Sequence, residues 1–408
     1  AEHGVIRNLS TSSGVAERYP AWSPDGKSIA YWSDRSGEYE LTIRNADGSG
    51  KEEKVTSYGA GYRYQPYWSP DSRKLAFVDQ AMDIQIYNRD TGKTVKAGKG
   101  LYMFHGGLNN FKVSWSADSR WLAYSRALNM SSSAIFLFDF ENSRLHQATS
   151  GYYADANPAF DPDGKYLYYF TNRTLRPVYS DLDNSWVYPN TTNIAAVVLR
   201  KDVASPLKPK NDEEAVEKKD DKKEDDKKKD DDKEKKPETK VVNIDLDGFE
   251  QRAVILPPEA GNYTDLYALS GKVLYRKLPR SGSADKERPV MYYDLEEREE
   301  KTILDDSQGY MLSADGKKLL TVNKGKYAIV DVKPNQKPEK PLRTAELEMQ
   351  LDPRAEWRQL FADTWRLQRD YFYDKNMHGV DWKAMRQQYG ALIEVCETRW
   401  DVHYVLGE

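Results

Sequence analysis

The feature that most constrains the fold is a four-residue cluster that returns along the chain at a nearly fixed interval. It reads Trp-Ser-Pro-Asp at 22–25 and at 68–71, Trp-Ser-Ala-Asp at 115–118, and Phe-Asp-Pro-Asp at 160–163. The four aspartates are 46, 47 and 45 residues apart. A period in the forties in a strand-rich sequence is typical of the blades of a β-propeller. We therefore expect a mainly β fold, a propeller built from tandem copies of one unit.

Each copy has the pattern of an antiparallel blade. In the first copy, short stretches with strand-like alternation cover 19–23, 28–33, 40–44 and 53–56; this period of two is typical of half-buried strands. Between them stand turn residues such as Pro, Asp and Gly. We expect each motif aspartate to cap the turn of its own blade. A metal-binding role is disfavoured, because equivalent positions lie far apart around a ring.

The number of blades is not settled by the repeat alone. A later copy at 312–316 and a weaker one at 267–275 bring the visible motifs and remnants to six. Residues 4–9 have the pattern of an outer strand that could complete a seventh blade. We expect a seven-bladed propeller of four-stranded blades over residues 1–345, although the repeat allows six or seven.

A run from about 205 to 240 interrupts this pattern. It consists almost wholly of Lys, Asp and Glu, so it cannot bury a core and is predicted to be a disordered insertion. The apolar stretches 194–199 and 241–244 on either side both have the pattern of strands. The insertion is therefore expected within a blade, where added loop length costs little stability.

Residues 346–408 change from the strand period to a helical one. Asp352 is predicted to cap a first helix that has Pro353 at its first position, as helix starts favour. Asp381 and Thr398 are predicted to cap a second and a third helix. So small a bundle with so many exposed aromatic residues is not expected to be a complete domain, and we interpret it as the truncated start of a larger core.

Composition excludes several classes of function. The net charge of −4 gives no basic excess for nucleic acid, and no run of about 18 apolar residues predicts a membrane span. A single cysteine, Cys396, excludes a disulfide framework and a cysteine zinc site. No two of the five histidines have metal-ligand spacing and no G-x-S-x-G motif occurs. We therefore assign no catalytic residue, no metal site and no cofactor to these 408 residues.

One set of residues is a candidate binding site. Aligning the copies places four polar residues five positions before the motif aromatic, and these are Glu17, Arg63, Asn110 and Asp155, with Arg18 adjacent. The innermost strand of each blade borders the central channel of a propeller. The set is therefore predicted to form a mixed-charge ring near one channel mouth that contacts a peptide. A hydrated rim without a ligand is the alternative, and the sequence leaves it open.

Longer stretches resemble a known family. Residues 17–27, 33–41 and 157–168, with the Lys/Asp insertion, resemble the second propeller of tricorn proteases. Residues 352–359 and 370–382 resemble the start of the tricorn catalytic core and are the most specific part of the match. The repeat motifs alone are shared with TolB-type propellers.

The resemblance implies a serine peptidase that degrades oligopeptides, with a seven-bladed propeller as substrate channel or filter. It also implies a homo-oligomer, peptide substrates and a cytoplasmic location, with a periplasmic or exported form as the alternative. In the family a Ser-His pair follows soon after the helix that ends here at Glu408, and the nucleophilic serine comes much later. No catalytic residue is therefore carried over, and the chain alone is expected to be inactive.

Two other interpretations compete with this one. A TolB-like propeller would be a non-catalytic module that docks a protein partner, but such a module needs no helical continuation. The propeller of a prolyl oligopeptidase is disfavoured because the continuation after residue 345 is of the wrong kind.

Overall fold

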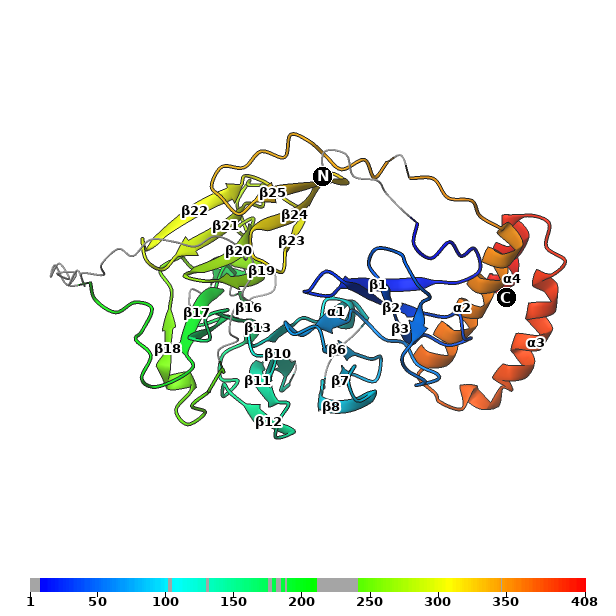
Figure 1. The fold of residues 1–408 in the computed structure, drawn as a ribbon, viewed down its shortest axis with the longest axis horizontal. Coiled ribbons are helices and arrows are strands. Elements are labelled where there is room, and N and C mark those ends of the chain that lie inside the picture. The colour runs from blue at the N-terminus through cyan, green and yellow to red at the C-terminus, as the bar shows by residue number, and fades with distance from the viewer. Residues whose placement is uncertain are drawn as a thin grey trace, which may run out of the picture.

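The chain is described by a computed structural model. The structure describes residues 8–101, 105–129, 132–174, 178–180, 185–187, 189–210, 241–345 and 347–408. Six sheets follow one another in chain order, five of four strands and a sixth of three, and a separate two-stranded hairpin extends from the fourth. Three longer helices follow the sheets and lie beside the first of them (Figure 1).

All neighbouring strands within the sheets are antiparallel. The first sheet contains β1 (Glu17–Trp22), β2 (Ser28–Ser33), β3 (Glu40–Asn45) and β4 (Glu53–Lys54). The second contains β5 (Tyr67–Trp68), β6 (Lys74–Val78), β7 (Asp83–Asn88) and β8 (Lys93–Lys99). The third contains β9 (Val113–Trp115), β10 (Trp121–Ala127), β11 (Ser133–Asp139) and β12 (Arg144–Gln147), with the short helix α1 (His105–Asn109) before it.

The second half of the propeller holds the longer excursions. The fourth sheet contains β13 (Asp155–Phe160), β14 (Tyr166–Thr171), β17 (Asn193–Val198) and β18 (Ala253–Ile255), with the hairpin β15 (Val178–Ser180) and β16 (Ser185–Val187) and the turn η1 (Glu250–Arg252). The fifth contains β19 (Asn262–Leu269), β20 (Lys272–Leu278), β21 (Val290–Asp294) and β22 (Glu299–Leu304). The sixth contains β23 (Gly309–Leu312), β24 (Lys318–Asn323) and β25 (Lys326–Asp331).

The recurring motif acts within each blade and between blades. In the third blade Ser116 Oγ donates to Asp118 at 2.5 Å, and Asp118 accepts the backbone N–H of Arg120 at 3.1 Å. The same arrangement recurs at the other Ser-x-Asp copies, which confirms these four aspartates as turn caps. The expectation is wrong for Asp163, because in that copy Asp161 accepts the backbone N–H groups of the turn while Asp163 accepts from Ser270 Oγ of the next blade at 2.6 Å. Neighbouring blades are also joined at these turns, since Ser119 Oγ accepts the backbone N–H of Asp71 at 3.0 Å.

The core is a series of clusters between successive sheets. One cluster joins the first, second and third sheets, and three others join the third to the fourth, the fourth to the fifth, and the fifth to the sixth. No such cluster joins the sixth sheet to the first within the described ranges. Consistent with this, Met311 and Ile329 of the sixth sheet and Trp22 of the first are exposed.

Two expectations about the propeller need adjustment. The structure has six blades, and the expected seventh is not confirmed; the strand proposed for it at 4–9 lies mostly outside the described residues. The strand expected at 241–244 is wrong, because that stretch forms no strand and β18 supplies the fourth strand of the blade. The insertion does fall between β17 and β18 of one sheet, as predicted, although residues 211–240 lie outside the description.

The helices of the C-terminal segment begin where their caps predict. Helix α2 (Pro353–Tyr371) is capped by Asp352, α3 (Trp382–Ile393) by Asp381, and α4 (Arg399–Gly407) by Thr398 in a capping box with Asp401. The turn η2 (Met377–Gly379) separates α2 from α3. In the described part of the chain no helix is both long and apolar enough to cross a membrane.

One ion pair inside a blade gives a pH-dependent prediction. Asp139 at the end of β11 accepts from Arg120 at 2.7 and 3.0 Å and from Asn142 at 2.7 Å. Burial alone would raise the pKa of Asp139, but these hydrogen bonds outweigh it and lower the pKa from 3.8 to about 2. A depressed folded-state pKa stabilises the protein above the unfolded-state pKa, and that stability is lost as pH falls through the window between the two.

We expect Asp139→Asn to lower the free energy of unfolding by about 2 kcal/mol at pH 7, and by roughly half that at pH 3. Urea unfolding at the two pH values measures the difference. An equal loss at both would show that the charge of Asp139 contributes nothing.

Candidate functional site

The aligned polar residues occupy equivalent places in the blades. Glu17 begins β1 opposite Ser33, Asp155 begins β13 opposite Thr171, and Arg63 forms an isolated bridge with Asp79 ahead of β5. Asn110 follows α1 and its side chain donates to Gly106 O at 2.8 Å. The first strands of neighbouring sheets contact one another, so they are the inner strands and these residues lie at one end of the propeller axis.

Glu17, Arg63 and Asn110 have hydrogen-bond partners in their own surroundings. Glu17 accepts from Ser12 Oγ at 2.8 Å. Arg63 is buried and donates to the carbonyl oxygens of Tyr39, Gly59 and Gly61 at 2.9–3.2 Å. Asp155 is fully buried, and burial raises its pKa. The structure thus places Arg63 and Asp155 between blades, while Glu17 and Arg18 keep part of their side chains exposed.

Arg18 belongs to a charged interface between the propeller and α2, formed by Arg18, Asp34, Asp363 and Arg366. Arg18 forms an ion pair with Asp363 and donates to Tyr62 at 2.8 Å. Arg366 forms ion pairs with Asp34 and Asp363 and donates to Gly37 O at 2.6 Å. Burial opposes the charge of Arg366, but the hydrogen bond to Asp34 and its negative charge outweigh that effect and raise the pKa of the guanidinium.

The contact continues toward the end of the helix. Arg369 donates to both carboxylate oxygens of Glu38 at 2.6 and 2.9 Å, and the rings of Tyr62 and Tyr371 lie 5.9 Å apart. The charge pattern of α2 did not predict this contact. Charged residues usually face water, whereas Asp363 and Arg366 are buried against the propeller. Helix α2 is therefore fixed beside Arg18, at the end of the propeller where the aligned polar residues lie.

Three of the inner strands share a second feature, a β-bulge at which the pairing with the next strand shifts out of register. The bulges follow Arg18 in β1, Ala156 in β13 and Thr264 in β19. Their first residues have positive φ, with Tyr19 at 54°, Asn157 at 50° and Asp265 at 55°. Bulges re-aim side chains, and here Tyr19 reaches Asn109 at 2.8 Å while Asp265 reaches Lys112 at 2.6 Å.

The contact of Asp265 spans the propeller. Lys112 immediately precedes the inner strand of the third sheet, and Asp265 lies in the inner strand of the fifth. Arg276 completes the axial cluster of Lys112, Asp265 and Arg276, and donates to Asp265 Oδ2 at 2.9 Å and to Ser307 O at 3.0 Å. Aligning the motifs did not predict this cluster. Its members meet because of the bulge at Asp265, and the sequence gives no signal for that bulge.

Tyrosine hydroxyls surround the axial cluster. Tyr310 in β23 donates to Asp265 O at 2.6 Å, and Tyr67 in β5 donates to Phe111 O at 2.7 Å. Burial raises the pKa of Tyr267 to about 12 and that of Tyr310 well above its ordinary value. These phenols therefore stay neutral at physiological pH, so the ionised groups of the axial cluster are its two cations and one carboxylate.

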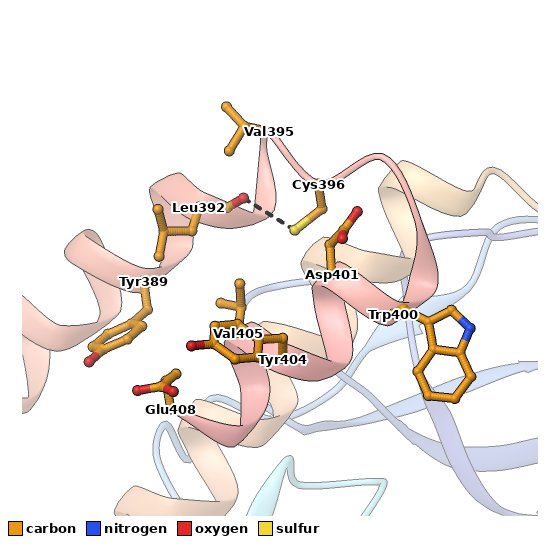
Figure 2. A pocket seen from close by; sticks show the side chains of 9 residues that line it. All are labelled: Tyr389, Leu392, Val395, Cys396, Trp400, Asp401, Tyr404, Val405 and Glu408. Carbon is orange, nitrogen blue, oxygen red and sulfur yellow. Dashed lines mark hydrogen bonds between the residues drawn. The ribbon is translucent and has the colours of Figure 1, made fainter.

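The helical segment holds a different kind of cavity. A hollow of about 450 Å³ lies between α3 and α4, with Tyr389 and Leu392 on one side and Tyr404 and Val405 on the other (Figure 2). Cys396 at its edge donates to Leu392 O at 3.3 Å, and burial raises the pKa of its thiol. A raised pKa disfavours the thiolate that a nucleophile requires, so Cys396 is poorly suited to nucleophilic attack, and most of the residues that line the cavity are apolar or aromatic.

The fold and the axis together define a β-propeller that carries a helical segment docked on its first blade. Residues 1–333 match the family model for the tricorn protease second beta propeller domain, and residues 353–408 match that for the tricorn protease C1 domain. The first match alone covers more than half of the chain. The chain therefore belongs to the tricorn protease family.

Individual relatives agree with this assignment. Tricorn protease homolog 1 of Streptomyces coelicolor is 26% identical over an alignment of 432 positions, which covers 99% of this chain and 39% of the relative. Tricorn protease homolog of Saccharolobus solfataricus is 24% identical over an alignment of 418 positions, which covers 99% of this chain and 35% of the relative. The chain thus spans well under two thirds of the length of these relatives.

A solved structure shows the same fold. The crystal structure of the tricorn protease matches 96% of this chain and 36% of its own length, with a TM-score of 0.73 and 19% identity. At 19% identity this match shows only that the blades and helices are arranged in the same way. The chemistry must be inferred from the residues of this chain.

Proposed function

We propose that this chain is the peptide-handling segment of a serine-type peptidase that degrades oligopeptides, with the propeller as substrate channel or filter. The observation that carries the proposal is the polar lining contributed by the inner strands, where Lys112, Asp265 and tyrosine hydroxyls converge. Peptides present amides, carboxylates and ammonium groups, which hydroxyls and charged side chains recognise through hydrogen bonds. Membership of a protease family supplies the class of ligand.

The proposal divides the chain into a propeller at 1–345 and the start of the peptidase core at 346–408. The charged interface would then hold the mouth of the passage against the core. We assign that mouth to Glu17, Arg18, Arg63, Asn110 and Asp155. Glu17 and Arg18 are suited to meet a peptide because they are partly exposed, whereas Arg63 and Asp155 support the mouth from between the blades.

The chemical step is proposed for the longer protein. A serine would attack the peptide carbonyl, a histidine would act as general base, and backbone N–H groups would hold the oxyanion. These groups are assigned to residues outside this chain. The protein is proposed to be a cytoplasmic homo-oligomer, as the family resemblance implies.

The corresponding prediction is binding without cleavage. We expect the purified 408-residue chain to bind oligopeptides and to release no fragments from them. Calorimetric titration measures the binding, and mass spectrometry after prolonged incubation measures the cleavage. Cleavage that a serine-directed inhibitor blocks would contradict the assignment of catalysis to other residues. Stoichiometric capture of one folded protein, with no affinity for any peptide, would favour the TolB-like docking module instead.

A further inference from the structure

We propose that Lys112 is the specificity-determining residue of the axial passage and that it selects peptides bearing a carboxylate. The inference rests on the proposed function, because it names the chemical class of peptide that the same passage accepts. It follows from the unequal way in which the two cations of the axial cluster are held.

Asp265 is held from two sides. Lys112 Nζ lies 2.6 Å from Oδ1, and Arg276 lies 2.9 Å (Nε) and 2.8 Å (Nη2) from Oδ2. The Arg276 and Asp265 side chains are 12% and 14% exposed, whereas that of Lys112 is 37% exposed. Arg276 also donates to Ser307 O, whereas among the residues that the structure describes the Lys112 ammonium pairs with Asp265 alone.

Lys112 is therefore the member of the cluster that can leave at small cost. When its ammonium turns away, Asp265 stays paired with Arg276 and no buried charge is left alone. Partly exposed pairs contribute little to stability, whereas removing one partner of a buried pair is expensive. Displacing Arg276 would break a buried pair and would therefore be expensive. A ligand that enters the axial passage is thus expected to displace Lys112.

The charge of the cluster sets which ligand gains from that movement. Two cations and one carboxylate leave a net charge of +1 at neutral pH. The hydroxyls of Tyr67 and Tyr310 are neutral donors already bound to backbone oxygens. A ligand carboxylate therefore accepts a hydrogen bond from the displaced Lys112 ammonium, whereas a ligand cation is repelled by the like charge. Both an acidic side chain and a free C-terminus have this chemistry.

The test uses the 408-residue chain and Gly/Ser oligopeptides of equal length, titrated calorimetrically. One peptide has blocked ends and a central glutamate pair, a second has only a free C-terminus, a third is blocked and neutral, and a fourth carries a central lysine pair. We expect Lys112→Met to weaken the carboxylate peptides about tenfold and the neutral peptide less than twofold. The first two peptides distinguish side chain from C-terminus as the source of the carboxylate.

Matched variants control for folding and for charge. Lys96→Met removes a lysine of the outer strand β8, whose Nζ lies 2.7 Å from Asp83 of β7, and it should leave all four affinities unchanged. Lys112→Arg keeps the cation and should restore preference for carboxylates. Equal affinities for wild type and Lys112→Met would overturn this inference while leaving the proposed function standing. Failure of the wild-type chain to bind any of the peptides would overturn both.

Discussion

Replacing Arg366 by methionine is expected to release α2 from the first blade, with a loss of about 3–5 kcal/mol in the free energy of docking. Arg366 joins Asp34 of the propeller to Asp363 of the helix, and their side chains are 4%, 5% and 9% exposed for Asp34, Arg366 and Asp363. Without the guanidinium, two buried carboxylates face each other with fewer partners. Breaking a buried ion pair by removing one member costs far more than the pair itself contributes.

Hydrogen exchange of the amides in 353–371 measures docking directly, and urea unfolding followed by circular dichroism measures overall stability. Arg358→Met is the matched control, because Arg358 pairs with Glu394 at 2.7 Å on the solvent side of the helical segment. That pair is exposed and its loss should change neither readout. Unchanged protection of α2 in Arg366→Met would show that the remaining contacts, the ion pairs of Arg18 and Arg369 and the packing of Leu367, hold the helix without Arg366.

The second large effect is expected at the motif tryptophans, which occupy the same position in successive blades. Trp68 is 8% exposed and donates through Nε1 to Ala21 O of the preceding blade at 2.9 Å. Trp22 is 61% exposed. We expect Trp68→Ala to lower the free energy of unfolding by about 3–5 kcal/mol, because it leaves a cavity between two blades.

Trp22→Ala is the matched control, and we expect it to cost less than about 1 kcal/mol, as surface substitutions do. Both values come from urea unfolding of the same chain. An equal cost for the two variants would mean that another sheet covers Trp22 in solution, as a closed ring would require.

Much of the fold could be predicted from local chemistry in the sequence. The motif aspartates mark their turns because a carboxylate two residues beyond a serine can bind both the hydroxyl and the next free N–H. Asp352, Asp381 and Thr398 mark helix starts for a similar reason. These features are local, and residues a few positions apart determine them.

The candidate site was harder to predict because it depends on contacts between distant residues. Aligning the motifs found the equivalent positions of Glu17, Arg63 and Asp155, but it could not show which way their side chains point. The bulge at Asp265 has no sequence signal, and its contact with Lys112 joins residues 153 positions apart. Likewise, the stretch at 241–244 has the pattern of a strand, but Asp118 and Trp121 of the third blade bind the backbone of Val242, and β18 pairs with β17 instead.

The most direct test of the account is to locate a bound peptide. A Gly/Ser oligopeptide with a central photoreactive benzophenone would be bound to the chain and irradiated, and the linked residues would be identified by mass spectrometry. We predict attachment to the inner strands around the axis, at Tyr67, Lys112, the segment 262–269 or Tyr310. Attachment confined to the cavity between α3 and α4, or to the outer strands β4, β8, β12 and β22, would contradict a peptide passage through the propeller.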